Sequence, residues 1–339
     1  MTRAGGRPPS MVDVAKRAGV AHVTVSRVLN DPDSVRPATR ERVEQAIAEL
    51  GYQRNDMARA LKRGRSGMLG VIIAGAELFE LPRVLLGVEE AAHAAGYWVS
   101  MASWQSGGLE QLNATIDRLV GQAAEGIAVI ADRSVAARAL ERVGARIPLS
   151  VVMSGDVPNP AIGSVELDQE LGARLATRHL LELGHAQVVH ISGRLGTFDA
   201  QARVRGWTAE MQASGTALPR MLEGDFTARS GYRAGMALAS EPQPPTAVFA
   251  GNDQMVIGLL AAFAEQELRV PQDVSVVGFD DMAGADYFVP ALTTVRQDFR
   301  QLGRRSIEVL LELIGGAEAR HHLIAPSLVV RRSTAAPLR

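Results

Sequence analysis

The sequence predicts a small all-α domain at the N-terminus, followed by a larger α/β domain with two lobes and parallel sheets. Three observations support this fold class. Within residues 1–53, apolar residues recur at helical spacing beside glycines and a proline that end or begin helices. Within residues 67–335, short apolar runs alternate with amphipathic stretches, which is typical of parallel sheets covered by helices. Roughly 260 residues is too many for one such sheet, so we expect two lobes.

Three short helices are expected in the N-terminal domain. The first follows a Ser-x-x-Asp capping box at residues 10–13 and ends at Gly19, which also makes a tight turn. The second spans residues 22–29, and the third begins at Pro37 and ends at Gly51. Two short helices about a glycine turn, supported by a third, are typical of a helix-turn-helix. For this pattern alone, the alternative is a plain helical subdomain.

The second helix carries the candidate DNA-reading residues, because a helix-turn-helix enters the major groove with the N-terminal end of that helix. His22 and Val23 are therefore expected at the base edges. The planar guanidinium of Arg27, one turn further on, can pair with guanine through two hydrogen bonds. The residues expected to contact DNA from this helix are His22, Val23, Thr24, Ser26, Arg27 and Asn30.

A connector at residues 54–66 joins the two domains. Its residues favour a helix, but the segment is too short to be a stable helix alone in water. We expect it to be helical only when it is supported by a partner. The alternative is a basic interdomain linker.

Charge is divided unevenly along the chain. Residues 1–66 carry 13 Lys and Arg against 7 Asp and Glu, a net charge of +6. The remainder carries 23 against 30, a net charge of −7. A basic head on an acidic body suits a module that docks on a polyanion, although a solvated basic surface would have the same composition.

Composition and motifs argue against several classes of protein. The chain has no cysteine, which excludes disulfides and thiolate metal sites. It has no Walker loop or G-x-G-x-x-G fingerprint, so we expect no nucleotide, no other cofactor and no metal. Charged residues interrupt the N-terminal apolar stretch, and no later run is long enough to span a bilayer. We therefore expect a soluble, cytoplasmic protein with no membrane partner.

The α/β body alternates predicted strands with predicted helices. Strands are expected at residues 68–74, 97–101, 126–130, 188–191, 247–250, 274–279 and 327–332. Helices are expected at residues 82–95, 109–122, 168–183, 201–213, 252–267 and 299–314.

Polar residues follow three of these strands, at the sheet edge where ligands of parallel α/β folds bind. Asp199 and Arg203 follow one predicted strand, and Asn252 and Asp280 follow the next two. A guanidinium, a carboxamide and carboxylates at loop positions can read the vicinal hydroxyls of a sugar, and aromatic faces complete such a pocket. The aromatic candidates are Phe79, Phe226 and Phe299.

Two sets of motifs match a known family. In the N-terminal part, the matching residues are 12–15, 18–20, 24–30, 39–40 and 49–52, with Asn55. In the body, they are 183–185, Arg203 with Gly206, 252–254, 273–281 and 292–299. On these residues the chain resembles the LacI/GalR family of bacterial transcriptional repressors over almost its whole length.

The resemblance implies a periplasmic-binding-protein-like body and a hinge helix in the connector that folds on DNA. In such repressors the hinge pushes a leucine between base steps of the minor groove, and Leu61 occupies that position. The hinge residues expected to contact DNA are Asn55, Ala58, Leu61 and Lys62. The resemblance assigns sugar hydroxyls to Arg203, Asn252 and Asp280, and the lining of the pocket to Gln297 and Phe299.

The chain departs from the family pattern at four positions. Ala21 and Arg36 stand where the family usually has serines that cap helices, and each lost cap is worth about 1 kcal/mol. Phe226 and Met153 stand where the member with the most similar motifs has a tryptophan and a sugar-contacting aspartate. The same sugar ligand is therefore not expected.

We expect a sequence-specific repressor of carbohydrate-utilisation genes that a sugar inducer releases from a pseudo-palindromic operator. No leucine heptad repeat follows the last predicted strand, so a homodimer is expected. One alternative is a regulator of opposite sign, with a purine or another small metabolite as corepressor. An exported sugar-binding protein would need a signal peptide. A further alternative is a sugar hydrolase that uses Asp199, Asp280 and Asp281.

Overall fold

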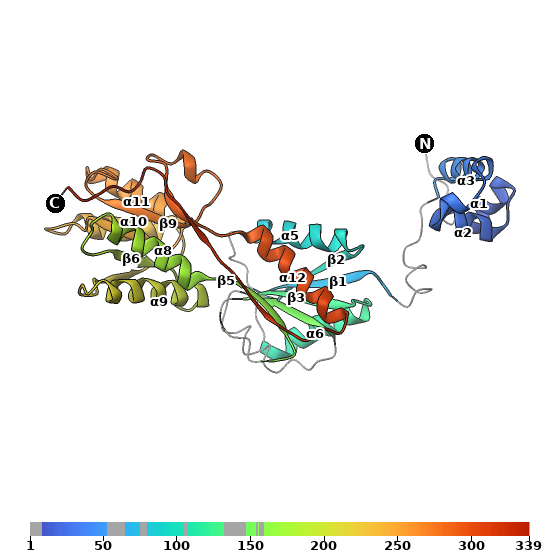
Figure 1. The fold of residues 1–339 in the computed structure, drawn as a ribbon, viewed down its shortest axis with the longest axis horizontal. Helices are drawn as coiled ribbons and strands as arrows, with labels where there is room; N and C mark the ends of the chain where they lie inside the picture. The colour runs from blue at the N-terminus through green and yellow to red at the C-terminus, as the bar shows by residue number, and fades with distance from the viewer. Residues whose placement is uncertain are drawn as a thin grey trace. The chain divides into compact units, whose positions relative to one another are not determined.

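The chain divides into two compact units, residues 1–66 and residues 67–339 (Figure 1). The computed structural model describes residues 9–52, 65–74, 80–104, 108–131, 147–153, 155 and 159–338. No helix in these ranges is long and apolar enough to cross a membrane.

The first unit is a three-helix domain. Its helices are α1 (Met11–Ala18), α2 (His22–Asn30) and α3 (Pro37–Leu50), with a short 3₁₀ helix η1 (Pro32–Ser34) between the last two. Gly19 and Gly51 end α1 and α3 at φ values of 67° and 62°, which glycine adopts without steric cost. The core is formed by Val14, Ala15, Ala18, Val25, Val28, Val43 and Ala46.

The caps of these helices follow the sequence. Ser10 makes a reciprocal capping box with Asp13 at the start of α1, as predicted. Ala21 and Arg36 occupy the N-cap positions of α2 and α3, and neither gives a side-chain cap. The two helices therefore begin without the hydrogen bond that a serine would supply at each position.

The second unit has two lobes, each built on a six-stranded sheet. The sheet of lobe 1 has the strand order β11-β5-β4-β3-β1-β2, with all neighbours parallel. Its strands are β1 (Met68–Ala74), β2 (Trp98–Trp104), β3 (Gly126–Ala131), β4 (Leu149–Val152), β5 (Gly163–Leu167) and β11 (His321–Ile324). Its described helices are α5 (Leu81–Ala94), α6 (Gly108–Gly121) and α12 (Phe299–Ile314).

The sheet of lobe 2 has the strand order β12-β10-β9-β8-β6-β7. Its strands are β6 (Val189–Ser192), β7 (Met221–Glu223), β8 (Ala247–Ala250), β9 (Ser275–Asp280), β10 (Thr293–Arg296) and β12 (Ser327–Val329). Its helices are α8 (Gln169–Glu182), α9 (Phe198–Ala213), α10 (Ala228–Ala239) and α11 (Asp253–Glu265), with the 3₁₀ helix η2 (Ala285–Tyr287). Strand β12 runs antiparallel to β10, whereas the other neighbours in this sheet are parallel.

Each sheet is buried on both faces, which explains why its central strands are nearly continuous apolar runs. In lobe 1, α5 and α12 cover one face and α6 covers the other. In lobe 2, α10 and α11 cover one face, and α8 and α9 cover the other. This confirms the predicted fold class, and β12 is the one antiparallel exception among the described strands.

Three segments cross between the lobes (Figure 1). They lie between β5 and α8, between β10 and α12, and between β11 and β12. The last residue of β5 is Leu167, and α8 begins at Gln169, so this crossing is only one residue long. Residues next to these crossings are therefore close to both lobes.

Glycines allow α5 and α12 to cross closely. A Cβ built on Gly87 would overlap the backbone carbonyl of Arg300, and one built on Gly303 would overlap that of Val84. Neither position can take a side chain unless the helices move apart. In lobe 2, Gly231 and Gly258 likewise allow α10 and α11 to cross closely.

Candidate functional site

Helix α2 presents one polar face to solvent and packs the other into the small domain. Val25 and Val28 are buried, which leaves His22, Val23 and Arg27 exposed. Val23 keeps 60% of its surface exposed, so its methyl groups are available to contact another molecule. Helix α2 therefore packs Val25 and Val28 inward and leaves the expected base-reading residues His22 and Val23 open to solvent.

The remaining candidates on α2 differ in exposure. Thr24 and Ser26 are half-buried, and Asn30 is exposed. The Asn30 side-chain amide donates to the Ser26 carbonyl oxygen over 2.7 Å and to Ser26 Oγ over 3.3 Å. The hinge candidates Asn55, Ala58, Leu61 and Lys62 lie outside the described residues.

A cavity of about 270 Å³ lies among residues of both lobes in the second unit. This volume is near the lower end of the range for small-molecule pockets, roughly 300–1,000 Å³. Phe79 lies outside the described residues. All the other predicted effector residues line the cavity, namely Asp199, Arg203, Phe226, Asn252, Asp280, Gln297 and Phe299.

The secondary structure around Arg203 differs from the prediction. Asp199 was expected in a loop before a helix at residues 201–213, but both Asp199 and Arg203 belong to α9, which starts at Phe198. The Thr197 side chain caps this helix by accepting a hydrogen bond from the Ala200 backbone N–H. Arg203 is thus held by a helix and is only 4% exposed.

Several neighbouring groups hold the guanidinium of Arg203 in place. Its Nε donates to Gln169 Oε1 over 2.9 Å, and its Nη1 donates to the Gly251 carbonyl. Its Cζ atom lies 4.0 Å from the centroid of the Phe279 ring, a cation–π arrangement. Asp280 Oδ1 lies 3.6 Å from Arg203 Nη2. A guanidinium held this way keeps one orientation toward the cavity.

Asp280 closes the network at the end of β9. Its φ of 106° lies in the left-handed region, which a residue other than glycine rarely adopts. Its Oδ1 accepts a hydrogen bond of 2.7 Å from Gln297 Nε2. Burial raises the pKa of Asp280 to about 7, although the charge of Arg203 opposes this shift. Asp280 can therefore change protonation state near neutral pH.

Gln169 links the two halves of this network, and it was not among the residues predicted from the sequence. Its Nε2 donates to Gln297 Oε1 over 2.7 Å, while its Oε1 accepts from Arg203. It stands at the first position of α8, directly after the crossing from β5. A hydrogen-bonded chain thus runs from Arg203 through Gln169 and Gln297 to Asp280.

Asn252 and Phe226 form the neighbouring part of the wall. Asn252 caps α11 by accepting from the Met255 backbone N–H over 2.9 Å, and its amide donates to the Phe226 carbonyl over 3.2 Å. Phe226 has a φ of 68°, and its ring covers Gly193 so closely that a Cβ there would overlap it. The aromatic face at this position is therefore held in place by its surroundings.

The lobe 1 wall of the cavity is mostly apolar. Met153, Ile130 and Leu81 are among its lining residues. Two carboxylates, Glu80 and Glu166, also line this wall, and neither was predicted from the sequence. Burial raises the pKa of Glu166, although a hydrogen bond from the Gly155 backbone N–H opposes this.

Trp207 and His185 do not line the cavity, and they make hydrogen bonds within lobe 2. Trp207 is 2% exposed and donates to the Val188 carbonyl over 2.7 Å. His185 bonds Thr246 and Ser275 inside lobe 2, as expected for structural packing. No group of three His, Cys, Asp or Glu residues within the described ranges could hold a metal ion.

The fold and cavity define a class of protein in which a helix-turn-helix domain is joined to a two-lobed, small-molecule-binding α/β domain. Comparison with family models gives two matches. Residues 10–55 match the bacterial regulatory proteins of the lacI family, and residues 177–334 match the periplasmic binding protein-like domain.

Individual relatives extend these matches over the whole chain. The lactose operon repressor of Escherichia coli (strain K12) is 35% identical, covering 98% of this chain and 92% of that protein. The HTH-type transcriptional repressor PurR of Edwardsiella ictaluri (strain 93-146) is 35% identical, covering 95% and 96%. The solved Lac repressor dimer bound to operator and the anti-inducer ONPF is 34% identical with a TM-score of 0.85, covering 97% and 100%. The chain belongs to the LacI family of bacterial regulatory proteins.

Proposed function

We propose that this protein represses carbohydrate-utilisation genes and leaves its operator when a sugar binds in the cavity. The observation that carries the proposal is the set of side chains around the cavity. Arg203, Asn252 and Asp280 offer a guanidinium, a carboxamide and a carboxylate, and Phe226 and Phe299 offer aromatic faces. Such a combination suits a polyhydroxylated ring, whose hydroxyls donate and accept hydrogen bonds while its C–H faces pack on aromatics.

DNA binding is assigned to the first unit. The exposed row of His22, Val23 and Arg27 on α2 suits contact with base edges, and the net charge of +6 on residues 1–66 suits contact with phosphates. The hinge residues Asn55, Ala58, Leu61 and Lys62 are assigned to the minor groove on sequence alone.

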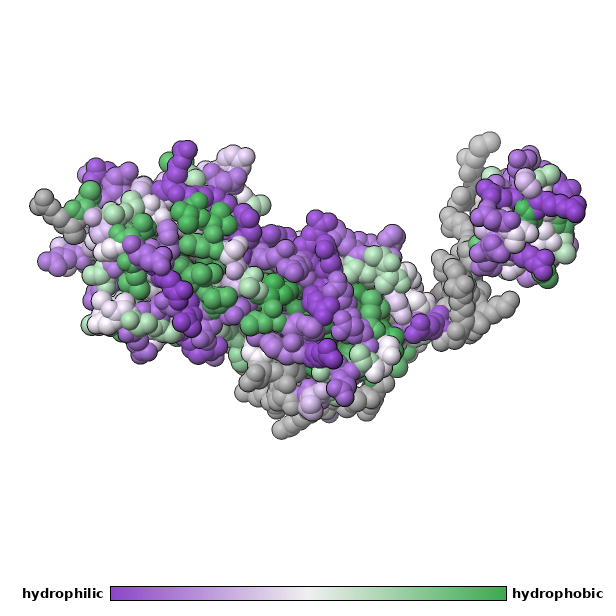
Figure 2. Space-filling view, in the orientation of Figure 1, coloured by the Kyte–Doolittle hydropathy of each residue, from purple (hydrophilic) through white to green (hydrophobic). Residues whose placement is uncertain are grey.

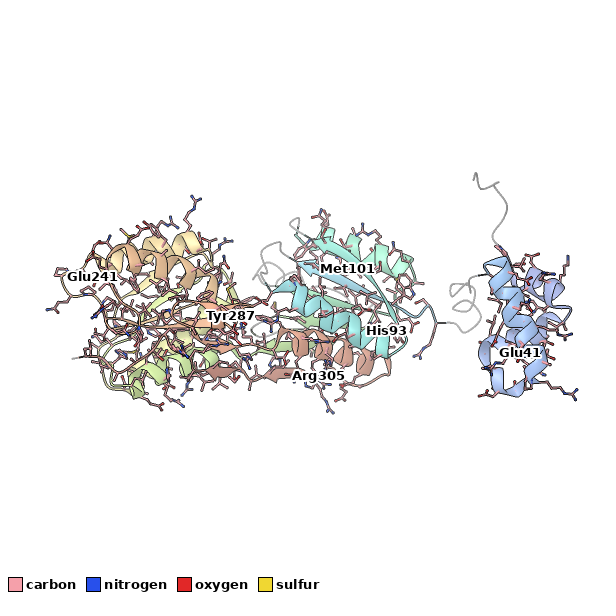
Figure 3. The ribbon with its side chains drawn as sticks, turned by 90° about the horizontal axis from the view of Figure 1, so that it is seen from above. Glu41, His93, Met101, Glu241, Tyr287 and Arg305 are labelled. Atoms are coloured by element: carbon pink, nitrogen blue, oxygen red, sulfur yellow. The ribbon has the colours of Figure 1, made fainter. Side chains whose placement is uncertain are left out.

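A homodimer is the proposed assembly on a pseudo-palindromic operator. Strand β2 is the edge of the lobe 1 sheet, and Trp98 and Met101 on it are 51% and 62% exposed. With Leu86 and His93 of α5, they line one groove, and His93 and Met101 are marked in Figure 3. Figure 2 shows apolar side chains gathered over both lobes of the second unit. Exposed apolar groups at a sheet edge are typical of an interface.

We further propose that the protein acts in the cytoplasm and has no enzymatic activity. The hydrolase alternative required Asp281 in the pocket with Asp199 and Asp280. Asp281 is not among the described residues that line the cavity. Its carboxylate instead binds Arg296 and Arg331 at 2.6 and 2.7 Å, which lowers its pKa and leaves it unsuited to acid catalysis.

The test begins with the full chain and an operator selected from random DNA. Affinity for that operator should fall steeply between low and moderate salt, because bound cations release counterions from DNA. Thermal-shift screening against mono- and disaccharides should identify a ligand that raises the melting temperature. Adding that ligand should weaken operator binding. A ligand that strengthens operator binding would make the protein a corepressor-dependent regulator instead.

A further inference from the structure

The charges around the cavity are unbalanced. Five carboxylates line it, against the guanidinium groups of Arg194 and Arg203, and both arginines belong to lobe 2. Among the described lining residues of lobe 1, none is basic, and the two carboxylates there are Glu80 and Glu166. On the lobe 1 side, an anionic ligand would therefore meet carboxyl groups and no cation among the described lining residues.

Glu166 differs from the other four carboxylates. Each of the four lies within 4.0 Å of an arginine nitrogen. The pairs are Arg83 with Glu80, Arg233 with Asp225, and Arg203 with both Asp199 and Asp280. Among the described residues, no lysine or arginine makes an ion pair with Glu166.

Neutral groups of the protein can donate the hydrogen bonds that Glu166 accepts. The Gly155 backbone N–H donates to its Oε2 over 2.6 Å, and His321 Nε2 lies 3.2 Å from its Oε1. On the other side of the imidazole, Ser164 Oγ lies 2.9 Å from His321 Nδ1. A neutral imidazole satisfies both contacts, with Nε2–H donating to Glu166 and Nδ1 accepting from Ser164.

The surroundings of Glu166 oppose its negative charge. Burial is the main cause that raises its pKa, and the carboxylates of Asp168 and Asp199 add repulsion. The half-exposed His321 gives only partial compensation. A cation that entered the cavity beside Glu166 would remove this unfavourable burial of charge.

The position of Glu166 makes it accessible to a ligand. Val165 of β5 pairs with Val152 of β4, so Glu166 and Met153 are the next residues along two neighbouring strands. Both line the cavity. Met153 cannot accept a strong hydrogen bond, so the carboxylate that faces a ligand on this part of the wall is supplied by β5.

We infer that the effector carries an amino group, that Glu166 binds this group as a cation, and that the effector is therefore an amino sugar. This inference rests on the proposed function and specifies its ligand. The hydroxyls face the polar groups of lobe 2, and the ammonium donates to Glu166 on lobe 1. One molecule then contacts lobe 2 through its hydroxyls and lobe 1 through its ammonium group.

Calorimetry on the full chain tests the ligand class without any substitution. The panel pairs glucose, galactose, mannose and cellobiose with their 2-amino forms, and adds glucose 6-phosphate as an anion. The amino form of the preferred sugar should bind about tenfold tighter or more than its neutral parent, because a charge-assisted hydrogen bond replaces a neutral one. The phosphate ester should bind more weakly than glucose.

Glu166→Gln tests the residue. It keeps an oxygen that can accept from Gly155 but removes the charge, so the preference for the amino form should disappear while the neutral parent still binds. The matched control is Glu80→Gln, which removes a lining carboxylate that already has an arginine partner. This control should keep the preference.

Three results would overturn the inference. Equal binding of neutral and amino forms to the unaltered protein would reject the amino sugar and leave the proposed function standing. A preference that survives Glu166→Gln in a protein with an unchanged circular dichroism spectrum would reject the role of Glu166. Failure of every carbohydrate in a wider screen would reject the proposed function itself.

Discussion

The two walls of the cavity are built on different principles. The lobe 2 wall is a closed network in which Arg203, Gln297 and Asp280 already have protein partners before any ligand binds. The lobe 1 wall is apolar, apart from Glu80 and Glu166. A preorganised polar wall gives directional recognition of hydroxyls at little entropic cost, whereas an apolar wall selects by shape. Specificity for the proposed sugar ligand should therefore come from lobe 2.

The residues that join the walls lie at the crossings between the lobes. Gln169 follows the first crossing, Gln297 lies in the second, and Phe299 follows the second. A ligand that touches these residues contacts the segments along which the lobes would move. A ligand shifts such an equilibrium only by binding one arrangement more tightly than the other. The structure thus allows recognition and switching to share the same side chains.

The largest effect is expected from Arg203→Ala. The substitution removes charge-assisted hydrogen bonds worth about 1.5–3 kcal/mol, so ligand affinity should fall by about one to two orders of magnitude. Isothermal calorimetry with the ligand from the screen measures this. Arg205→Ala is the control, because Arg205 is exposed and pairs only with Glu170 among the described contacts. Full ligand affinity in folded Arg203→Ala would remove the lobe 2 wall from the recognition site.

Burial also affects the protonation of a carboxyl group in the core of lobe 2. Asp253 of lobe 2 is fully buried, and burial raises its pKa to about 8. In the unfolded chain its pKa is near the usual value of about 3.9. Between these values the folded state holds a proton that the unfolded state has lost, so this group makes the protein less stable as pH rises from about 4 to about 8.

The variant Asp253→Asn tests this predicted fall in stability with rising pH. The variant cannot titrate at this position, so the stability of the unaltered protein relative to the variant should increase as pH is lowered from 8 to 5. Thermal unfolding across this range gives the comparison. Asp273→Asn is the control, because Arg269 lowers the pKa of Asp273 to about 2, and this group does not titrate in the window. Parallel curves for the unaltered protein and Asp253→Asn would show that Asp253 is ionised in the folded state.

The sequence predicted the lobe 2 wall better than the lobe 1 wall, for a physical reason. Arg203, Asn252 and Asp280 follow strands with strong apolar runs, so the edge of the sheet could be located from hydropathy. Strand β5 has the sequence Gly-Ser-Val-Glu-Leu, which contains no apolar run because its glutamate faces the cavity. No strand was predicted at β5, and Glu166 was missed with it. Gln169 lies in the helix predicted at residues 168–183 but was not identified as a binding residue.

Helix boundaries show a similar limit. Helix α9 begins at Phe198 because of the Thr197 cap, whereas the sequence pattern predicted a start at residue 201, which put Asp199 in a loop. Helix α10 was missed altogether. It contains Gly231 and Gly235, which weaken the helical pattern but allow close packing against α11. In both cases a tertiary contact or a cap determined the helix, and periodicity alone did not reveal it.

The smallest effect is expected on the apolar wall. Met153→Leu conserves volume, so its cost in ligand affinity should stay below about 1.5 kcal/mol. Calorimetry under the conditions used for Arg203→Ala gives a direct comparison of the two walls. A loss as large as that of Arg203→Ala would mean that shape on lobe 1 contributes as much as the polar network of lobe 2, and the contrast between the walls would disappear.

The central claim is that ligand binding in the cavity and operator binding by α2 are coupled. The most direct test measures the coupling in both directions on the full chain, as operator affinity with and without saturating ligand, and as ligand affinity with and without operator. Thermodynamic linkage requires the two factors to be equal. We predict that the ligand weakens operator binding and that operator weakens ligand binding by the same factor. An operator affinity unchanged by a ligand that Arg203→Ala fails to bind would contradict the account.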